Sequence, residues 1–109
     1  EKSKLSFFTL QQILEISSKT NSEVFFTYTE SAMDLFPAQP LVYLYRGEAL
    51  QKQQRYHEAI DVLEQGIDFV VDDSKLEDQF YTILADLYLI IDNPYKAKEY
   101  LKKSQRNKN

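Results

Sequence analysis

The side chains that could carry metal or acid–base chemistry are few in this chain. The only histidine, His57, precedes Asp61 by four residues, so both would lie on one face of a helix and offer two metal ligands. A zinc site needs three or four ligands, and there is no cysteine or second histidine to complete one. A solvent-facing turn at a helix start is the ordinary interpretation of this pair, and we expect no bound metal.

A second acidic group comprises Asp72, Asp73, Glu77 and Asp78. It lacks the alternating ligands and the glycine bend of a calcium loop, so it predicts a loop that caps a helix. With no cysteine and two glycines, the chain also has neither a thiol nucleophile nor a glycine-rich phosphate loop. The sequence therefore predicts a protein that is not an enzyme and that binds no cofactor.

The composition favours long helices around a core. Hydrophobic residues make up 43% of the 109 residues, and the two glycines and three prolines argue against a turn-rich β protein. No apolar run is long enough for a membrane-spanning helix. The absence of cysteine excludes a disulfide framework and is compatible with both the cytosol and export.

The net charge of −4 is unevenly distributed. Residues 96–109 carry six basic side chains against one acid, whereas the remainder carries seven bases against sixteen acids. Because an acidic body repels phosphates, we expect no nucleic-acid partner. The basic tail is interpreted as the cationic end of a helix, with contact to an anion as the alternative.

Hydrophobic spacing predicts three pairs of helices. Helices are expected from about Ser6 to Ser18, from Ser22 to Leu35, from Pro40 to a turn at Lys52–Arg55, from Tyr56 to Val70, from Ser74 onward, and after Pro94. Thr20–Glu23 and Ser74–Glu77 have the form of capping boxes, which predicts that each begins a helix.

The central helices share a pattern of small and bulky residues. Tyr43, Gly47 and Leu50 form one stripe, and a small residue at a helix crossing allows two backbones to approach closely. The pattern recurs 38 residues later with Ala85 in place of Gly47. The predicted packing residues are Tyr43, Gly47, Leu50, Ala59, Leu63, Gly66, Tyr81, Ala85, Tyr88, Ala97 and Leu101.

This pattern resembles the tetratricopeptide repeat, which combines an aromatic, a leucine–glycine pair and an Ala-x3-aromatic motif. The resemblance implies an all-α, right-handed α-solenoid of about three helical hairpins, six helices in all. It implies one domain over residues 1–109, with repeats at 6–39, 40–77 and 78–109. The first repeat is degenerate, and an ungapped offset of 34 residues places Ile13 under Gly47 and Ile16 under Leu50.

The resemblance also implies a concave groove, lined by the first helix of each repeat, that binds a peptide or protein segment. The candidate partner-binding residues are Tyr45, Glu48, Lys52, Gln79, Thr82 and Asp86, and register adds the apolar Leu10, Leu14, Leu44, Ile83 and Ile90. For Leu10, Leu14 and Leu44, packing between repeats is an equal alternative. The groove lacks the cations that grip a C-terminal carboxylate in chaperone-binding members, so that ligand is not expected.

A narrower similarity concerns the runs FPAQPLVYLYRGEALQ and GIDFVVDDSKLEDQFYTILADLY. They resemble segments of long, multi-repeat tetratricopeptide proteins of anaerobic Gram-negative bacteria, many of which are exported. This similarity implies part of a longer bacterial protein and favours the periplasm or cell envelope over the cytoplasm. The predicted function is a non-enzymatic protein-binding scaffold. The alternative is a structural spacer or a self-association module, acting through apolar surface at Ile90–Ile91 or the terminal helix.

Overall fold

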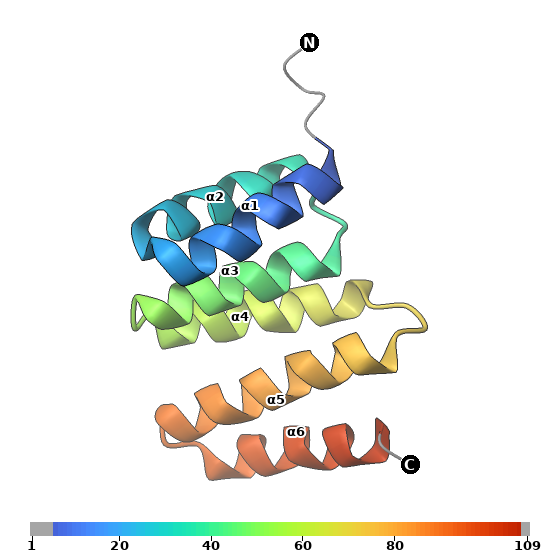
Figure 1. Ribbon diagram of the computed structural model, residues 1–109. Helices are drawn as coiled ribbons and strands as arrows, with labels where there is room; N and C mark the ends of the chain where they lie inside the picture. The colour runs from blue at the N-terminus through green and yellow to red at the C-terminus, as the bar shows by residue number, and fades with distance from the viewer. Residues whose placement is uncertain (1–5, 108–109) are drawn as a thin grey trace.

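The computed structural model describes residues 6–107, and the side chains of residues 6–104. This part of the chain forms α-helices with no strand (Figure 1). The elements are α1 (Phe7–Thr20), α2 (Ser22–Leu35), α3 (Pro40–Lys52), α4 (Tyr56–Gly66), the 3-10 helix η2 (Ile67–Phe69), α5 (Ser74–Ile90) and α6 (Pro94–Asn107). The ends of the predicted domain, and Arg106 and Lys108 of the predicted basic tail, fall outside the described side chains.

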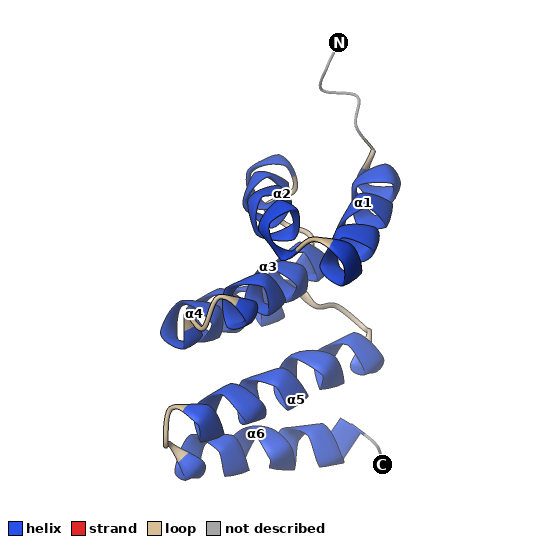
Figure 2. Cartoon of the chain, turned by 60° about the vertical axis from the view of Figure 1, so that its left-hand side comes forward, coloured by secondary structure: helices blue, strands red, loops and turns tan. Residues whose placement is uncertain are grey.

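Consecutive helices pair into three hairpins, α1/α2, α3/α4 and α5/α6, which are stacked along the molecule (Figures 1 and 2). The predicted all-α fold of six helices is confirmed for the described range. α5 has 17 residues against 13 in α3, so the four extra residues of the longer sequence offset lie in this helix. The boundary between residues 77 and 78 that the sequence predicts for repeats 2 and 3 falls inside α5.

α2 and α5 begin at Ser22 and Ser74 as predicted, but the residue that caps each helix lies one position away from the cap of the predicted capping box. Asn21 caps α2, because its side-chain oxygen accepts hydrogen bonds from the backbone N–H groups of Glu23 and Val24, both at 3.1 Å. Thr20 is instead the last residue of α1, and its hydroxyl donates to the carbonyl of Ile16. The short carboxamide of asparagine is a better cap than threonine, so the neighbouring residue takes this role.

The same shift occurs at α5. Asp73 accepts a hydrogen bond from the N–H of Leu76 at 3.0 Å, and Ser74 is the first helical residue rather than the cap. The predicted starts at Pro40 and Pro94 are confirmed. The fourth helix stops earlier than predicted, because α4 ends at Gly66 and the chain continues as η2 instead of α-helix.

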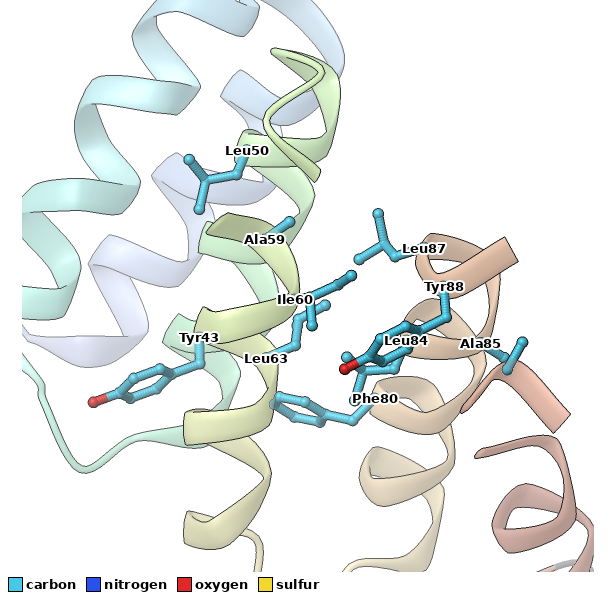
Figure 3. Packing of buried hydrophobic residues seen from close by; sticks show 11 residues of the cluster. Tyr43, Leu50, Ala59, Ile60, Leu63, Phe80, Leu84, Ala85, Leu87 and Tyr88 are labelled. Atoms are coloured by element: carbon cyan, nitrogen blue, oxygen red, sulfur yellow. The ribbon is translucent and has the colours of Figure 1, made fainter. Parts of the chain in front are cut away.

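Two hydrophobic clusters hold the hairpins together. The larger joins the second and third hairpins, and Figure 3 shows Phe80 and Leu84 of α5 close to Leu63 of α4. Its buried members are Tyr43, Leu50, Ala59, Ile60, Leu63, Phe80, Leu84, Ala85, Leu87, Tyr88 and Ala97. The smaller joins the first hairpin to α3 through Leu10, Leu14, Phe25, Ala32, Val42 and Ala49.

The two glycines lie where helices cross, as the stripe pattern predicts. A Cβ at Gly47 would lie 2.6 Å from Cγ of Leu63, and a Cβ at Gly66 would lie 2.2 Å from Cβ of Tyr43. Neither glycine has a positive φ. Their importance is therefore the space that a side chain would occupy, and not backbone freedom.

The predicted register of the first helix is wrong by one residue. Leu10, Leu14 and Ser17 face the interior, whereas Ile16 is 64% exposed. Leu14 therefore corresponds to Gly47, an offset of 33 residues, while Ala32 keeps the offset of 34 from Gly66. The cause is the turn between the helices: α1 and α2 are separated by Asn21 alone, whereas three residues separate α3 from α4.

One predicted packing residue is not packed. Leu101 is 45% exposed, although Leu63, at the same position of the preceding hairpin, is 0% exposed. Leu63 is covered by α5, and no described helix covers the corresponding side of α6. Tyr81 is half-buried, and its ring lies 5.9 Å from that of Tyr100.

Candidate functional site

A groove of about 550 Å³ lies between α3 and α5. Helical spacing explains which residues line it: on α3, Leu41 lies one turn before the adjacent Leu44 and Tyr45, and Glu48 lies one turn after them. The lining residues are Leu41, Leu44, Tyr45, Glu48, Gln51, Asp78, Gln79, Thr82 and Ile83. We refer to this site as the α3/α5 groove.

Both walls of the groove are fixed by the core. On α3, Tyr43 is buried and packs against Gly66 of α4. Its hydroxyl donates a hydrogen bond to the carbonyl of Pro37 at 2.7 Å. On α5, Phe80 and Leu84 are fully buried against the second hairpin. Each wall thus presents its groove residues from a helix that is anchored by neighbouring buried positions.

The structure brings together four of the six polar residues predicted for partner binding. Tyr45, Glu48, Gln79 and Thr82 all line the α3/α5 groove, together with the apolar Leu44 and Ile83. Their role in binding a partner stays a prediction.

Lys52 and Asp86 do not line the groove. The ammonium of Lys52 donates to the carbonyl of Ser18 at 2.5 Å and lies 5.1 Å from the centre of the Phe25 ring. Lys52 therefore links α3 to the first hairpin. Asp86 is exposed one turn beyond Thr82 on α5.

The predicted placement of Leu10 and Leu14 in the groove is wrong. Both are buried in the smaller core cluster, so the alternative of packing between hairpins holds for them. Ile90 is exposed on the last turn of α5 but is not a groove residue. The one-residue shift in α1 explains the first error, because the predicted groove positions of that helix rotate into the core.

Sequence reasoning missed Leu41, Gln51 and Asp78. Each lies one helical turn from a residue that was predicted, for example Asp78 four residues before Thr82. Extending the predicted stripe by a turn in each direction would have found them.

The groove is electrostatically negative. Burial raises the pKa of the Tyr45 hydroxyl, and the carboxylates of Glu15 on α1 and Glu48 raise it further. The Tyr45 ring also meets Phe25 edge-on, with ring centroids 6.1 Å apart. Tyr45 therefore connects the floor of the groove to the smaller core cluster. Its hydroxyl also lies in the electrostatic field of two carboxylates.

The one arginine of α3, Arg46, points away from the groove and stabilises the fold. Arg46 donates from Nη1 to the carbonyl of Phe26 at 2.7 Å and to the hydroxyl of Thr29 at 3.0 Å. Its guanidinium lies 4.2 Å from the centre of the Phe26 ring, and burial lowers its pKa. Arg46 thus holds α3 against α2.

A shared acceptor ties the second hairpin to the third. One carboxylate oxygen of Glu64 on α4 accepts hydrogen bonds from the hydroxyls of Tyr88 and Tyr100, each at 2.8 Å. The two tyrosine rings stack with centroids 5.9 Å apart. Burial and the bond to Glu64 raise the pKa of Tyr88 to about 12 and that of Tyr100 further. This cluster fixes the angle between the hairpins that form the groove.

Within residues 6–104, no three histidine, cysteine, aspartate or glutamate side chains converge as a metal site requires. His57 and Asp61 are both exposed on α4. None of the described helices is both long and apolar enough to cross a membrane.

Stacked helical hairpins with an open groove between their first helices define the molecule as a helical repeat protein. Residues 78–108 match the model of the tetratricopeptide repeat family, and the six described helices fit a tetratricopeptide repeat protein. No curated protein matches the chain. The matched segment begins inside α5 and covers α6, so it corresponds to the third predicted repeat. The match indicates a protein–protein interaction module, and the family is generally a non-enzymatic scaffold.

Proposed function

We propose that this chain binds a peptide or protein segment in the α3/α5 groove and performs no catalysis. The supporting observation is the groove itself, whose volume of about 550 Å³ lies within the range of known ligand pockets. Its lining combines apolar Leu41, Leu44 and Ile83 with the amide and hydroxyl groups of Gln79 and Thr82. Apolar contacts supply affinity and the polar groups orient a bound segment.

A preformed groove favours binding, because little conformational entropy is lost when a ligand enters. The buried side chains of α3 and α5 hold both walls in place. The hydrogen bonds from Tyr88 and Tyr100 to Glu64 restrict movement of the third hairpin against the second. The binding surface therefore belongs to the rigid part of the fold.

The test is site-specific photo-crosslinking in an extract of the source cells. A photoreactive amino acid replaces Gln79 in the groove, and the matched control carries it at Gln65, an exposed position on α4. We expect a protein segment that crosslinks at Gln79 and not at Gln65, and mass spectrometry then identifies its sequence.

The identified segment is synthesised and its affinity is measured by calorimetry. Thr82→Arg fills the groove from an exposed position and should abolish binding, whereas Gln65→Arg should leave it unchanged. Equal affinity of both variants, or identical crosslinks at the two positions, would contradict groove binding.

A second candidate function is self-association through the last hairpin. Leu89, Ile90, Tyr95 and Leu101 are exposed large hydrophobic side chains on α5 and α6. An apolar surface of this kind favours protein contact. Sedimentation velocity over a hundredfold concentration range tests it: the mass should rise with concentration and Leu101→Glu should prevent the rise. A constant monomer mass would exclude this function.

A further inference from the structure

The charges of the α3/α5 groove have one sign. Glu48 on α3 and Asp78 on α5 both line it, and the lining contains no lysine, arginine or histidine. Glu15 of α1 acts on the same region, because the negative charges of Glu15 and Glu48 both raise the pKa of the Tyr45 hydroxyl. Negative charge therefore approaches the groove from three helices.

Neither lining carboxylate is neutralised by a cation of the described chain. Across residues 6–104, an ion pair joins Arg55 to Glu58. Both residues are exposed, and neither lines the groove. Asp78 accepts a hydrogen bond from the Ser104 hydroxyl, which is neutral. Both carboxylates are half-buried, so solvent screens them less than it screens fully exposed charges.

The two cations nearest to Glu48 in sequence are already engaged. Arg46 donates to Phe26 and Thr29, and Lys52 donates to the carbonyl of Ser18. Among residues 6–104, the structure shows no cation paired with either of the two carboxylates at the groove. A ligand that supplies a positive charge gains Coulomb energy there, and one with a negative charge meets repulsion.

We infer that the occupant of the α3/α5 groove is a peptide segment of a partner protein with a lysine or arginine beside an apolar residue. This inference rests on the proposed function, because it specifies the ligand of the same groove. The aliphatic stem of lysine or arginine covers apolar surface such as Leu44 and Ile83 while its charged end reaches the carboxylates. The neighbouring apolar residue of the ligand occupies the remaining floor.

The experiment is selection of random twelve-residue peptides on phage by the immobilised chain. Four forms are compared: the wild type, the groove-blocking Thr82→Arg, the double variant Glu48→Gln with Asp78→Asn, and a matched control. The control is Asp61→Asn with Asp68→Asn. It also removes two negative charges, but from exposed positions outside the groove. Asparagine at residue 78 keeps a side-chain oxygen for the Ser104 hydroxyl, so the hydrogen bond between α5 and α6 is preserved.

We expect wild-type and control selections to enrich the same peptides, with lysine or arginine next to an apolar residue. In the double variant the apolar preference should persist and the basic preference should vanish. The affinity of a selected peptide for this variant, measured by fluorescence anisotropy, should fall roughly two- to fivefold for each carboxylate removed. Raising the salt concentration should weaken wild-type binding and leave the double variant nearly unchanged.

Three outcomes would overturn the inference, and they separate it from the proposed function. Groove-dependent selection of peptides without basic residues refutes the ligand class and leaves groove binding intact. Equal loss of the basic preference in the control shows that the acidic body as a whole attracts cations, which also refutes it. Selections that are identical for the wild type and Thr82→Arg refute groove binding itself.

Discussion

Replacing Gly66 by alanine should destabilise the fold more than the same change at Gly47. At Gly66 the new Cβ would lie 2.2 Å from Cβ and 2.6 Å from Cγ of Tyr43, and 3.1 Å from a ring carbon of Phe80. The Cβ of Tyr43 is bonded to its backbone, so the clash can be relieved only if α3 and α4 move apart. At Gly47 the contacts are to the branched end of Leu63, which can rotate.

The magnitudes follow from two opposing terms. Overpacking of a core costs about 1–3 kcal/mol, and we assign the upper end to Gly66 because backbone must move. Alanine in a helix interior gains about 1 kcal/mol over glycine, which is fully available at Gly47 and less so at Gly66, the last residue of α4. The net cost is about 2 kcal/mol for Gly66→Ala, which lowers Tm by roughly 8 °C. For Gly47→Ala it is about 0–1 kcal/mol.

The assay is urea and thermal unfolding followed by circular dichroism at 222 nm. Gln65→Gly, at the exposed neighbouring position, measures the helix-propensity term alone. Leu63→Val should be better tolerated in the Gly47→Ala background than in the wild type, because it shortens the clashing side chain. A Gly66→Ala variant as stable as the wild type, or more stable than Gly47→Ala, would refute the close helix crossing.

The remaining predictions concern a turn, a hydroxyl and a guanidinium. Gln54 has a φ of 61°, so Gln54→Gly should raise Tm by a few degrees, while Gln53→Gly, at a φ of −89°, should lower it. The raised pKa of Tyr88 means that the folded state holds this proton more tightly than the unfolded state, so stability should fall as pH rises from 10 to about 12. Urea midpoints should show a shallower fall for Tyr88→Phe, and equal slopes would contradict this. Arg46→Lys should lower the free energy of unfolding by about 1–2 kcal/mol, because the shorter lysine loses the hydrogen bonds from Nη1 to Phe26 and Thr29 and has no planar guanidinium to stack on the Phe26 ring. An unchanged urea midpoint would show that these contacts contribute nothing.

The sequence was sufficient to place the helix starts of the second and third hairpins, because those signals are local. Pro40 and Pro94 mark helix starts, and Gly47 and Gly66 mark a crossing that the structure contains. These features depend on steric rules that act within a few residues. The cap of α2 shows the limit of such rules: Thr20 and Asn21 are adjacent and both suit the role, and the structure uses Asn21, the better cap of the two.

The first hairpin was harder to place, since its register depends on the length of a turn. A one-residue turn at Asn21 moves Leu14 into the core and Ile16 to the surface. Nothing in the apolar spacing of α1 distinguishes the two registers, because Ile13 and Ile16 satisfy helical periodicity as well as Leu10 and Leu14 do. The groove residues on α3 and α5 were consequently predicted, whereas the prediction that Leu10 and Leu14 of α1 extend the groove was wrong.

Leu63 and Leu101 show why burial at equivalent positions cannot be assigned from a repeat pattern alone. Both follow an alanine by four residues, yet α5 covers Leu63 completely and no described helix covers Leu101. In a solenoid each hairpin supplies half of an interface, so the burial of one side chain depends on the next element. Leu63→Ala should therefore cost about 2–5 kcal/mol, whereas Leu101→Ala should cost much less in this chain. An equal loss of stability would mean that α6 is covered in solution, and sedimentation velocity of the wild type would then show whether a second copy covers it.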